Sequence, residues 1–526
     1  MKRRKFLIGT ANVAFSTAYI YGLQSLMETC FGLNQALAQT EDEINYLNIQ
    51  MPGAPPRWYF DQPLNPFNKS GDFTAGLYGT EIRKVGGKFQ PIHIGKKMMF
   101  GGQQVYMPPV WNLKSASSGK AFKELLEHTM MIRGVDMEIN SHTVNRERVV
   151  RPVASQPSIT GLVADKSNLP LSASGQMGTR ATSAFKSEKG SSVISVNKGN
   201  PIPNLIDSFK GRVTKAEDLD IAVTQVMESL DDYAKERGLS SQGGEGQQMS
   251  AYEMFDKNLD SFNKKYVGIY KKYQAIVRKE IRAAFPGVTT VNPISDESVL
   301  FSVNRGPVFV KGALNNSIDS KTHINATAQA FAFAEFALTE KLSSSVTVDA
   351  SGSVMQSVKG VGNVPCDQHF VGGVASVFYT SLYYRAFLGC LMELKVKLEA
   401  AGIFDKTLIH IMTEFSRTPK KDGSGADHGF NGSSVTLIGG MIETPGLVGN
   451  IRKKTVSNDN NRYPGTWGEA APFNFSTGRR PIVNDDIVNT VCEIVGVKKI
   501  AVKGQSLIRK SGEKVSWIKK WEVRNV

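Results

Sequence analysis

The sequence predicts an α/β fold: a mostly parallel central sheet covered by helices on both faces, with an inserted helical hairpin. Short apolar segments bounded by turn residues alternate with long stretches of helical periodicity, which is the order expected of a parallel sheet with covering helices. A chain of 526 residues with 41% hydrophobic content can also bury a large core. We therefore expect one α/β domain over residues 39–526, behind an amino-terminal leader.

Six short apolar segments are predicted to be buried strands. Most are flanked by turn residues, and each has the length typical of a strand. They are Ile44–Met51, His128–Val135, Ser192–Val196, Ser345–Ala350, Thr407–Met412 and Ser434–Gly440.

Two long helices are predicted between the later strands. Ile324–Leu342 is rich in alanine, and Val374–Ala401 carries apolar residues at helical spacing. Gly402 ends the second helix, because glycine adopts the left-handed conformation common after a helix carboxyl terminus. These helices supply the connections that parallel strands require.

A third helical region, about residues 215–285, interrupts this alternation. Lys215–Gly238 and Leu259–Ile276 each have one apolar helical face, and the polar linker Ser240–Ser250 separates them. We expect a helical hairpin inserted into the α/β body, with its apolar faces packed against the core.

Residues 1–38 have the features of a signal peptide. Arg3 and Arg4 precede an uncharged, moderately apolar stretch, and Ala36 and Ala38 occupy the small-residue positions that favour cleavage before Gln39. The paired arginines resemble the twin-arginine signal, whose export machinery would then be a partner. An uncleaved anchor is the alternative, but polar residues make the stretch a poor span. We expect a periplasmic or secreted protein with no stable membrane span after cleavage.

Replacing Arg3 and Arg4 with lysine tests this export route. The precursor should accumulate in the cytoplasm, because the export receptor recognises the arginine pair. Fractionation with an antibody against the mature chain would measure this, and normal export of the variant would contradict the twin-arginine assignment.

The basic charge of the chain favours anionic partners. The formal charge is +15, and the mature chain keeps about +12 because cleavage removes four basic residues and one acid. The lysines are dispersed, and no basic run with interleaved aromatic residues predicts a nucleic-acid groove. We expect an anionic small molecule or envelope polymer as partner, and no nucleic acid.

Acidic residues and histidines follow the predicted strands where those strands end. Asp367 and His369 precede the second long helix, and Glu414 follows the next strand. Asp427 and His428 close the loop after it. Because ligand sites in open parallel sheets form at the carboxyl ends of strands, we expect these five residues to converge. Mixed oxygen and nitrogen ligands suit a divalent ion such as zinc or manganese.

Each of these residues also has an ordinary structural interpretation. An Asp before a helix is commonly an N-cap, Glu414 alone could be a solvated loop acid, and Asp427 could form an Asx-turn. Their joint placement favours the metal site in a chain with only seven histidines. Arg417 could hold an anionic substrate with its planar fork. Four other histidines are interpreted as structural: His93, His128, His323 and His410.

Three segments resemble an exported bacterial family called domain of unknown function 1501. The segment "TEFSRTPKKDGSGADHGF", which contains Glu414 and His428, resembles the family signature "EFGRTP…G…DHG". "CDQH", ending at His369, is similar to the family's "DTH", and "SHT", beginning at Ser141, is similar to its "SHF". The resemblance is strongest between about Ile324 and Gly449.

This family is related to the alkaline phosphatase and sulfatase superfamily, whose metallohydrolases bind one or two divalent ions at strand ends. The resemblance implies an alkaline phosphatase-like fold and metal roles for Asp367, His369, Glu414 and His428, with Asp427 beside them. Ser141 occupies the position that matches the family and is the candidate nucleophile.

The sequence also departs from the family. The first strand usually leads to a "GGxDG" loop, but here "PGAPPRWYFDQP" has no acid before Asp61, which puts a second metal ion in doubt. Two functions therefore stay open. One is a metal-dependent hydrolase of phosphate esters, with sulfate esters disfavoured. The other is a non-catalytic envelope protein that keeps the fold for binding or structure.

Overall fold

The computed structural model describes most of the chain between residues 43 and 518. The longer described segments are 43–62, 95–167, 251–283, 321–350, 367–369, 373–419, 426–453 and 467–518. The shorter ones are 81–85, 88–92, 169, 173–176, 184–191, 193–196, 302–303 and 306–307. The expected signal peptide lies outside these residues. No helix within the described segments is long and apolar enough to cross a membrane.

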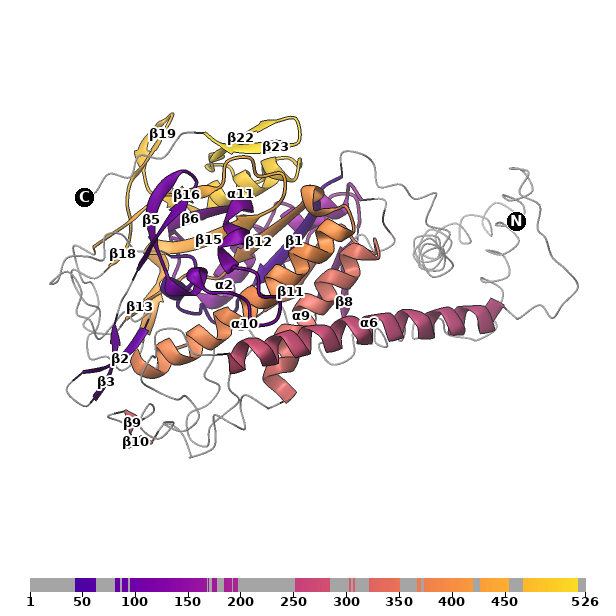
Figure 1. Ribbon diagram of the computed structural model, residues 1–526. Helices are drawn as coiled ribbons and strands as arrows, with labels where there is room; N and C mark the ends of the chain where they lie inside the picture. Colours follow the sequence, from indigo (N-terminus) through magenta and orange to yellow (C-terminus); the bar gives the residue numbers. More distant parts are fainter. Residues whose placement is uncertain are drawn as a thin grey trace, which may run out of the picture.

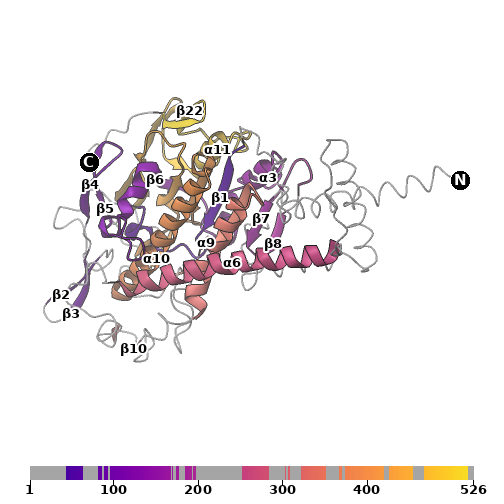
Figure 2. The same ribbon diagram turned by 45° about the vertical axis from the view of Figure 1, so that its right-hand side comes forward.

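A mixed sheet forms the centre of the described part of the chain (Figures 1 and 2). Eight of its nine strands follow the order β16-β6-β15-β12-β1-β11-β7-β8, and the ninth, β21, pairs with β6. All six strands predicted from the sequence belong to it, as β1, β6, β8, β11, β12 and β15. The bounds are β1 Asn45–Gln50, β6 Thr129–Asp136, β7 Ala173–Gln176, β8 Val193–Val196, β11 Ser345–Asp349, β12 Thr407–Met412, β15 Ser433–Ile438, β16 Gly446–Val448 and β21 Ile482–Val483.

One strand runs against the others. β15 is antiparallel to both of its neighbours, β12 and β6, whereas the remaining pairs in the sheet are parallel. The reversal follows from the connection, since the chain leaves β12 into the hairpin β13 (Ser416–Pro419) and β14 (Ala426–Gly429). A hairpin turns the chain around without a crossover helix. β15 therefore starts at the edge where β12 ends.

Helices cover both faces of this sheet, as predicted. On one face pack α6 (Ala251–Arg282), α9 (Lys321–Thr339) and α10 (Gly373–Ala400) (Figure 2). The other face carries α3 (Ile159–Ala164) and α11 (Asn484–Ile494), and α2 (His142–Arg148) follows β6 in the chain. Alternate residues of β1 join different cores, because side chains of a strand point to opposite faces. Leu47 and Ile49 pack with α10, and Tyr46 packs with α11.

Helix α10 confirms the longest predicted helix. It is buried around much of its circumference, which its apolar sequence allows. It ends before Gly402, whose φ of +68° is the left-handed conformation that glycine adopts without strain. The amide of Ile403 then bonds back to the carbonyl of Leu398 and closes the helix.

Helix α6 is the second half of the predicted helical hairpin. Tyr273 on α6 donates a hydrogen bond to Glu335 on α9 at 2.7 Å, and Glu280 pairs with Arg385 on α10 at 3.1 Å. The first half, Lys215–Gly238, lies outside the described residues. The insertion thus packs against the body through α9 and α10.

The remaining elements are short. Hairpins are formed by β2 (Glu81–Val85) with β3 (Lys88–Ile92), β4 (Lys96–Phe100) with β5 (Gln103–Met107), β9 (Ser302–Val303) with β10 (Gly306–Pro307), β17 (Ile451–Lys453) with β18 (Trp467–Ala470), β19 (Phe473–Phe475) with β20 (Gly478–Arg480), and β22 (Ile508–Ser511) with β23 (Lys514–Trp517). Five 3-10 turns complete the described set: η1 (Arg57–Tyr59), η2 (Pro109–Asn112), η3 (Phe122–His128), η4 (Phe404–Lys406) and η5 (Phe430–Gly432).

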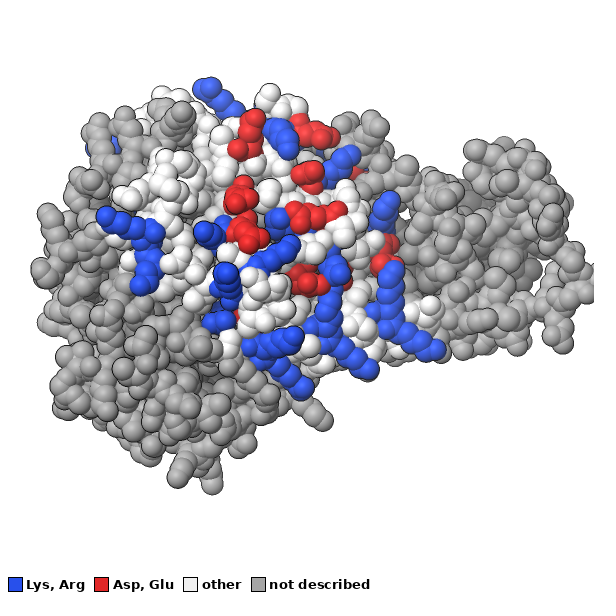
Figure 3. Space-filling view, viewed as in Figure 1, with Lys and Arg blue, Asp and Glu red and all other residues white. Residues whose placement is uncertain are grey.

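The charge on the face of Figure 1 is mixed. Figure 3 shows Lys and Arg side chains along the lower part of this face, over α6, with acidic side chains above them. Lys264, Lys271 and Arg278 are exposed on α6, and Lys265 pairs with Glu340 at 2.6 Å. The dispersed lysines predicted from the sequence are thus interleaved with acids on this face.

Candidate metal centre

The candidate site lies where β6, β11 and β12 end. The chain enters α2 after β6, reaches residues 367–369 after β11, and passes through Glu414 into the β13–β14 hairpin after β12. Because these three strands run in the same direction, their carboxyl ends share one edge of the sheet. The hairpin then carries His428 back over this edge.

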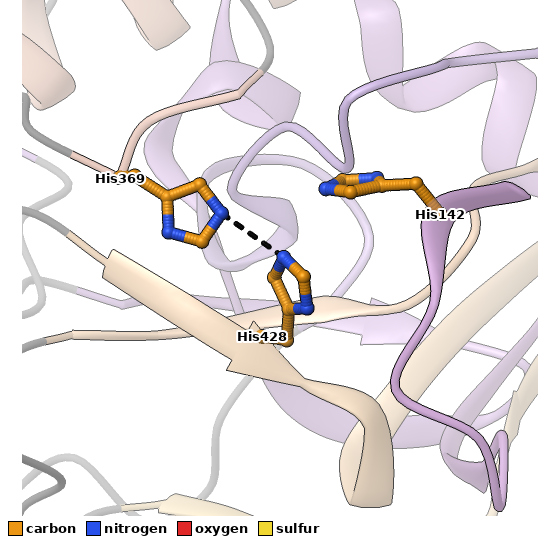
Figure 4. A group of neighbouring side chains, drawn as sticks. All are labelled: His142, His369 and His428. Carbon is orange, nitrogen blue, oxygen red and sulfur yellow. Dashed lines mark hydrogen bonds between the residues drawn. The ribbon is translucent and has the colours of Figure 1, made fainter.

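Three histidines converge at this edge (Figure 4). His142 comes from α2, His369 from the segment before α10, and His428 from β14. One ring nitrogen from each lies within 4.8 Å of the others. Nε2 of His369 is 3.0 Å from Nε2 of His428. Among the described residues these three form the group able to hold a metal ion.

Each histidine has an oxygen atom facing its Nδ1. Nδ1 of His369 is 3.3 Å from Asp427 Oδ1, and Nδ1 of His142 is 3.5 Å from Glu414 Oε1. Nδ1 of His428 contacts Asn140 Oδ1. Protons on Nδ1 would satisfy these oxygens and leave each Nε2 with a free lone pair. A carboxylate or carbonyl behind each ring is the usual arrangement around a metal-binding histidine.

A cation between the rings resolves an otherwise unfavourable contact. In that protonation state the lone pairs of His369 and His428 would face each other across 3.0 Å, which is repulsive without a positive charge between them. Nε2 of His142 is enclosed and has no hydrogen-bond partner among the described residues. A buried polar atom of this kind is ordinarily satisfied, so this nitrogen fits a metal ligand.

Asp367 adds an oxygen atom to the same group. Its Oδ1 is 3.3 Å from Nε2 of His369, and its Oδ2 is 3.7 Å from Nε2 of His142. Bonds of about 2.0–2.1 Å at tetrahedral angles place ligand atoms about 3.3 Å apart. The contacts of His369 match this spacing, whereas Asp367 approaches His142 through its other oxygen at 3.7 Å. The three histidine nitrogens form the group that could hold a divalent ion, and Asp367 lies beside them.

His369 and His428 are held in the neutral form that binds metals. Burial, together with the nearby charge of Arg417, lowers the pKa of His428 to about 3. The same two causes lower the pKa of His369. A neutral imidazole offers its lone pair at neutral pH without first losing a proton.

The structure places Glu414 behind His142, and its role as a direct ligand stays a prediction. Its carboxylate accepts hydrogen bonds from the amides of Gly53 and Ala54 at 3.1 and 3.0 Å, and from Arg146. Burial favours the neutral acid, but His142 and Arg146 lower the pKa of Glu414 to about 2. The ionised Glu414 therefore orients His142, and its lone pairs are largely occupied.

Arg417 is likewise not a free anion clamp. It is 2% exposed, and its guanidinium donates to the carbonyls of Gly53, Ala54 and Ala426 at 2.6, 2.9 and 3.3 Å. It also donates to Asp367 Oδ1 at 2.6 Å. This strand-end arginine is buried, because the hairpin folds it under the β1 loop. In the structure Arg417 holds Asp367 in place.

The other predicted residues have distinct positions. Ser141 is the N-cap of α2, where its Oγ accepts the amide of Val144 at 3.4 Å. Asp61 is buried and bonds to Arg57, Ser434 and Thr436. It does not belong to the group formed by the three histidines. The described residues therefore contain one group able to hold a metal ion.

Sequence reasoning missed His142. It lies inside the segment "SHT", in which Ser141 was interpreted as the functional residue and His142 was not considered as a ligand. The available signal was that His142, like His369 and His428, follows the carboxyl end of a predicted strand. Figure 4 shows its ring beside those of the other two histidines.

Residues 389–464 match the model of a family described as protein of unknown function (DUF1501). The family description names no activity. The match runs from within α10 across the β13–β14 hairpin, and it includes Glu414 and His428 but neither His142 nor His369. It covers less than half of the chain and supports the resemblance over that part.

Other comparisons add little. One solved structure, titled "Crystal structure of Ps i-CgsB in complex with k-i-k-neocarrahexaose", aligns with 88% of this chain and 75% of that chain. Its sequence identity is 10% and its TM-score is 0.29, which is too low to indicate a shared fold. No curated protein matches the chain. The alkaline phosphatase-like fold therefore stays a prediction, while the α/β class with a mixed sheet is observed.

Proposed function

We propose that this protein is an exported hydrolase that uses one divalent ion to cleave phosphate or related anionic esters. The observation that supports this most is the convergence of His142, His369 and His428, each with an oxygen atom behind its ring. A set with three imidazoles suits zinc better than manganese, which prefers oxygen ligands.

The residues of the site have separate roles in this proposal. His142, His369 and His428 would hold the ion through Nε2, and Asp367 would complete the set. An ion held there supplies Lewis-acid chemistry, which polarises an ester oxygen and acidifies a nearby hydroxyl. Ser141, next to His142 in the chain, supplies the attacking oxygen. Arg417 fixes the orientation of Asp367.

A non-catalytic envelope protein is the second candidate. The observation that favours it is that two residues expected at a catalytic centre already use their charged groups in hydrogen bonds within the protein. Arg417 uses its guanidinium on three carbonyls and Asp367, and Glu414 uses its carboxylate on Gly53, Ala54 and Arg146. A metal held only for stability would need no open side chains around it.

Turnover by the metal-loaded protein separates the two candidates. Natively exported protein should hold about one divalent ion per chain and hydrolyse aryl phosphate or phosphodiester esters. Ser141→Ala should lower turnover more than about 100-fold, since it removes the attacking oxygen, and should keep the ion. Ser155→Ala, at an exposed loop serine, is the matched control. Absence of turnover by the metal-loaded wild type on phosphate, phosphonate and sulfate esters would favour the non-catalytic candidate.

A further inference from the structure

Arg146 lies beside the histidine group and differs from Arg417 in its contacts. It sits one turn after His142 on α2, so the two side chains share a helical face. Both approach the same atom, Glu414 Oε1, His142 through Nδ1 and Arg146 through Nε. This contact fixes one edge of the Arg146 guanidinium next to a proposed metal ligand.

The two terminal nitrogens of Arg146 remain available. Within the described part of the chain, its hydrogen bonding is confined to the contact between Nε and Glu414. The side chain is 22% exposed, and both Nη atoms reach solvent. Arg417, by contrast, is fully committed to carbonyls and Asp367. Arg146 is therefore the guanidinium of this site that can still bind an external anion.

A small hollow adjoins Arg146. It has room for about one water molecule, and its lining is part polar and part apolar: Gln50, Arg146, Thr413 and Glu414 with Met51, Pro52, Val149 and Met412. Gln50 is 3% exposed, and neither atom of its side-chain amide has a hydrogen-bond partner among the described residues. A buried amide without partners normally marks a place where water or a ligand atom binds. The hollow thus offers a second donor beside the free arginine edge.

Glu414 keeps its negative charge, and the positive charge of the paired Arg146 offsets it. Its oxygens already accept from two amides, from the hydroxyl of Thr413 at 3.1 Å and from Arg146. The planar fork of arginine matches two oxygens of a phosphate or sulfate group, which lysine cannot match in the same way.

We propose that Arg146 and Gln50 form an oxyanion subsite beside the histidine group, which takes the phosphate or sulfate group of a ligand. One oxygen occupies the hollow next to Gln50, and the free edge of Arg146 binds two oxygens. The subsite rests on the proposed function only for the identity of the ester, because oxyanion binding is measurable without turnover.

Calorimetric titration of the full mature protein with inorganic phosphate, and separately with sulfate, tests this subsite. Arg146→Lys should bind either anion about tenfold or more weakly, because the bidentate edge is lost while a positive charge stays near Glu414. Gln50→Met, which keeps the side-chain volume, should weaken binding by a smaller factor. Arg148→Lys on the same helix is the matched control, since Arg148 pairs with Glu138 instead.

The outcomes distinguish this subsite from the proposed function. Weaker anion binding by Arg146→Lys, with metal content and unfolding temperature unchanged, supports the subsite even if no ester is turned over. If Arg146→Lys binds phosphate and sulfate as the wild type and Arg148→Lys do, the subsite is wrong. Failure of the wild type to bind either anion also overturns it, whatever its metal content. If Arg146→Lys turns over an ester with an unchanged Michaelis constant, the proposed hydrolase function is supported and the proposed subsite is wrong.

Discussion

Alanine at His142 should remove the divalent ion as completely as alanine at His369 or His428. Each change deletes one of three converging nitrogens, and the remaining two cannot complete a four-coordinate site. We expect the affinity for zinc to fall by more than the factor of about 10–100 that follows loss of a group which only orients a ligand. Metal analysis of exported protein and competition with a chelating dye would measure this.

Two matched variants sharpen this test. Asp427→Asn changes the group behind His369 but leaves the ring, so its effect should stay within about 10–100-fold. His128→Gln alters a histidine outside the cluster, whose ring meets Phe404 edge to face, and should keep the ion. If His142→Ala keeps its full metal content, His142 is not a ligand. The ligands would then be sought among the residues predicted from the sequence.

Alanine at Arg417 should destabilise the fold severely. It removes a buried charge together with its bonds to three carbonyls and to Asp367, and it leaves those oxygens without donors. Breaking a buried charged network from one side costs about 3–5 kcal/mol in the free energy of unfolding. Urea unfolding followed by tryptophan fluorescence would show a lower midpoint. The exposed share of Asp367 adds little, since solvent screens it.

Comparison with other arginines makes this result specific. Arg509→Ala, at an exposed strand residue, should change the free energy of unfolding by less than about 0.5 kcal/mol. Arg417→Lys should fall between the two, because lysine keeps the charge but cannot reach several carbonyls at once. A wild-type unfolding midpoint for Arg417→Ala would mean that the substrate-binding role first expected from the sequence deserves a new test.

The fold class was accessible from the sequence because central strands and their covering helices carry local signals. β1, β11, β12 and β15 are buried along their whole length, and their apolar runs stand out between turn residues. The direction of β15 has no such signal. It depends on whether the residues after β12 form a crossover or a hairpin, and the glycines of that connection permit either.

The site could be predicted only in part. His369 and His428 converge as expected, and Asp367 lies with them, since strand ends gather at one edge. The roles of Glu414 and Arg417 could not be predicted, because both depend on the backbone of a distant loop at Gly53 and Ala54. Almost every residue has a backbone amide and carbonyl, so hydrogen bonds to them cannot be predicted from the residue types.

That loop has a consequence for comparing related sequences. Gly53 and Ala54 both have positive φ, +90° and +51°, and they serve the site with their amides and carbonyls alone. Neither side chain makes a bond to the site, yet few residues fit here, because positive φ favours glycine and the methyl group of Ala54 is fully buried. A larger side chain at either position would displace the backbone that holds Glu414 and Arg417. In a related sequence, such a residue would therefore argue against an intact centre, as a change at His142 would.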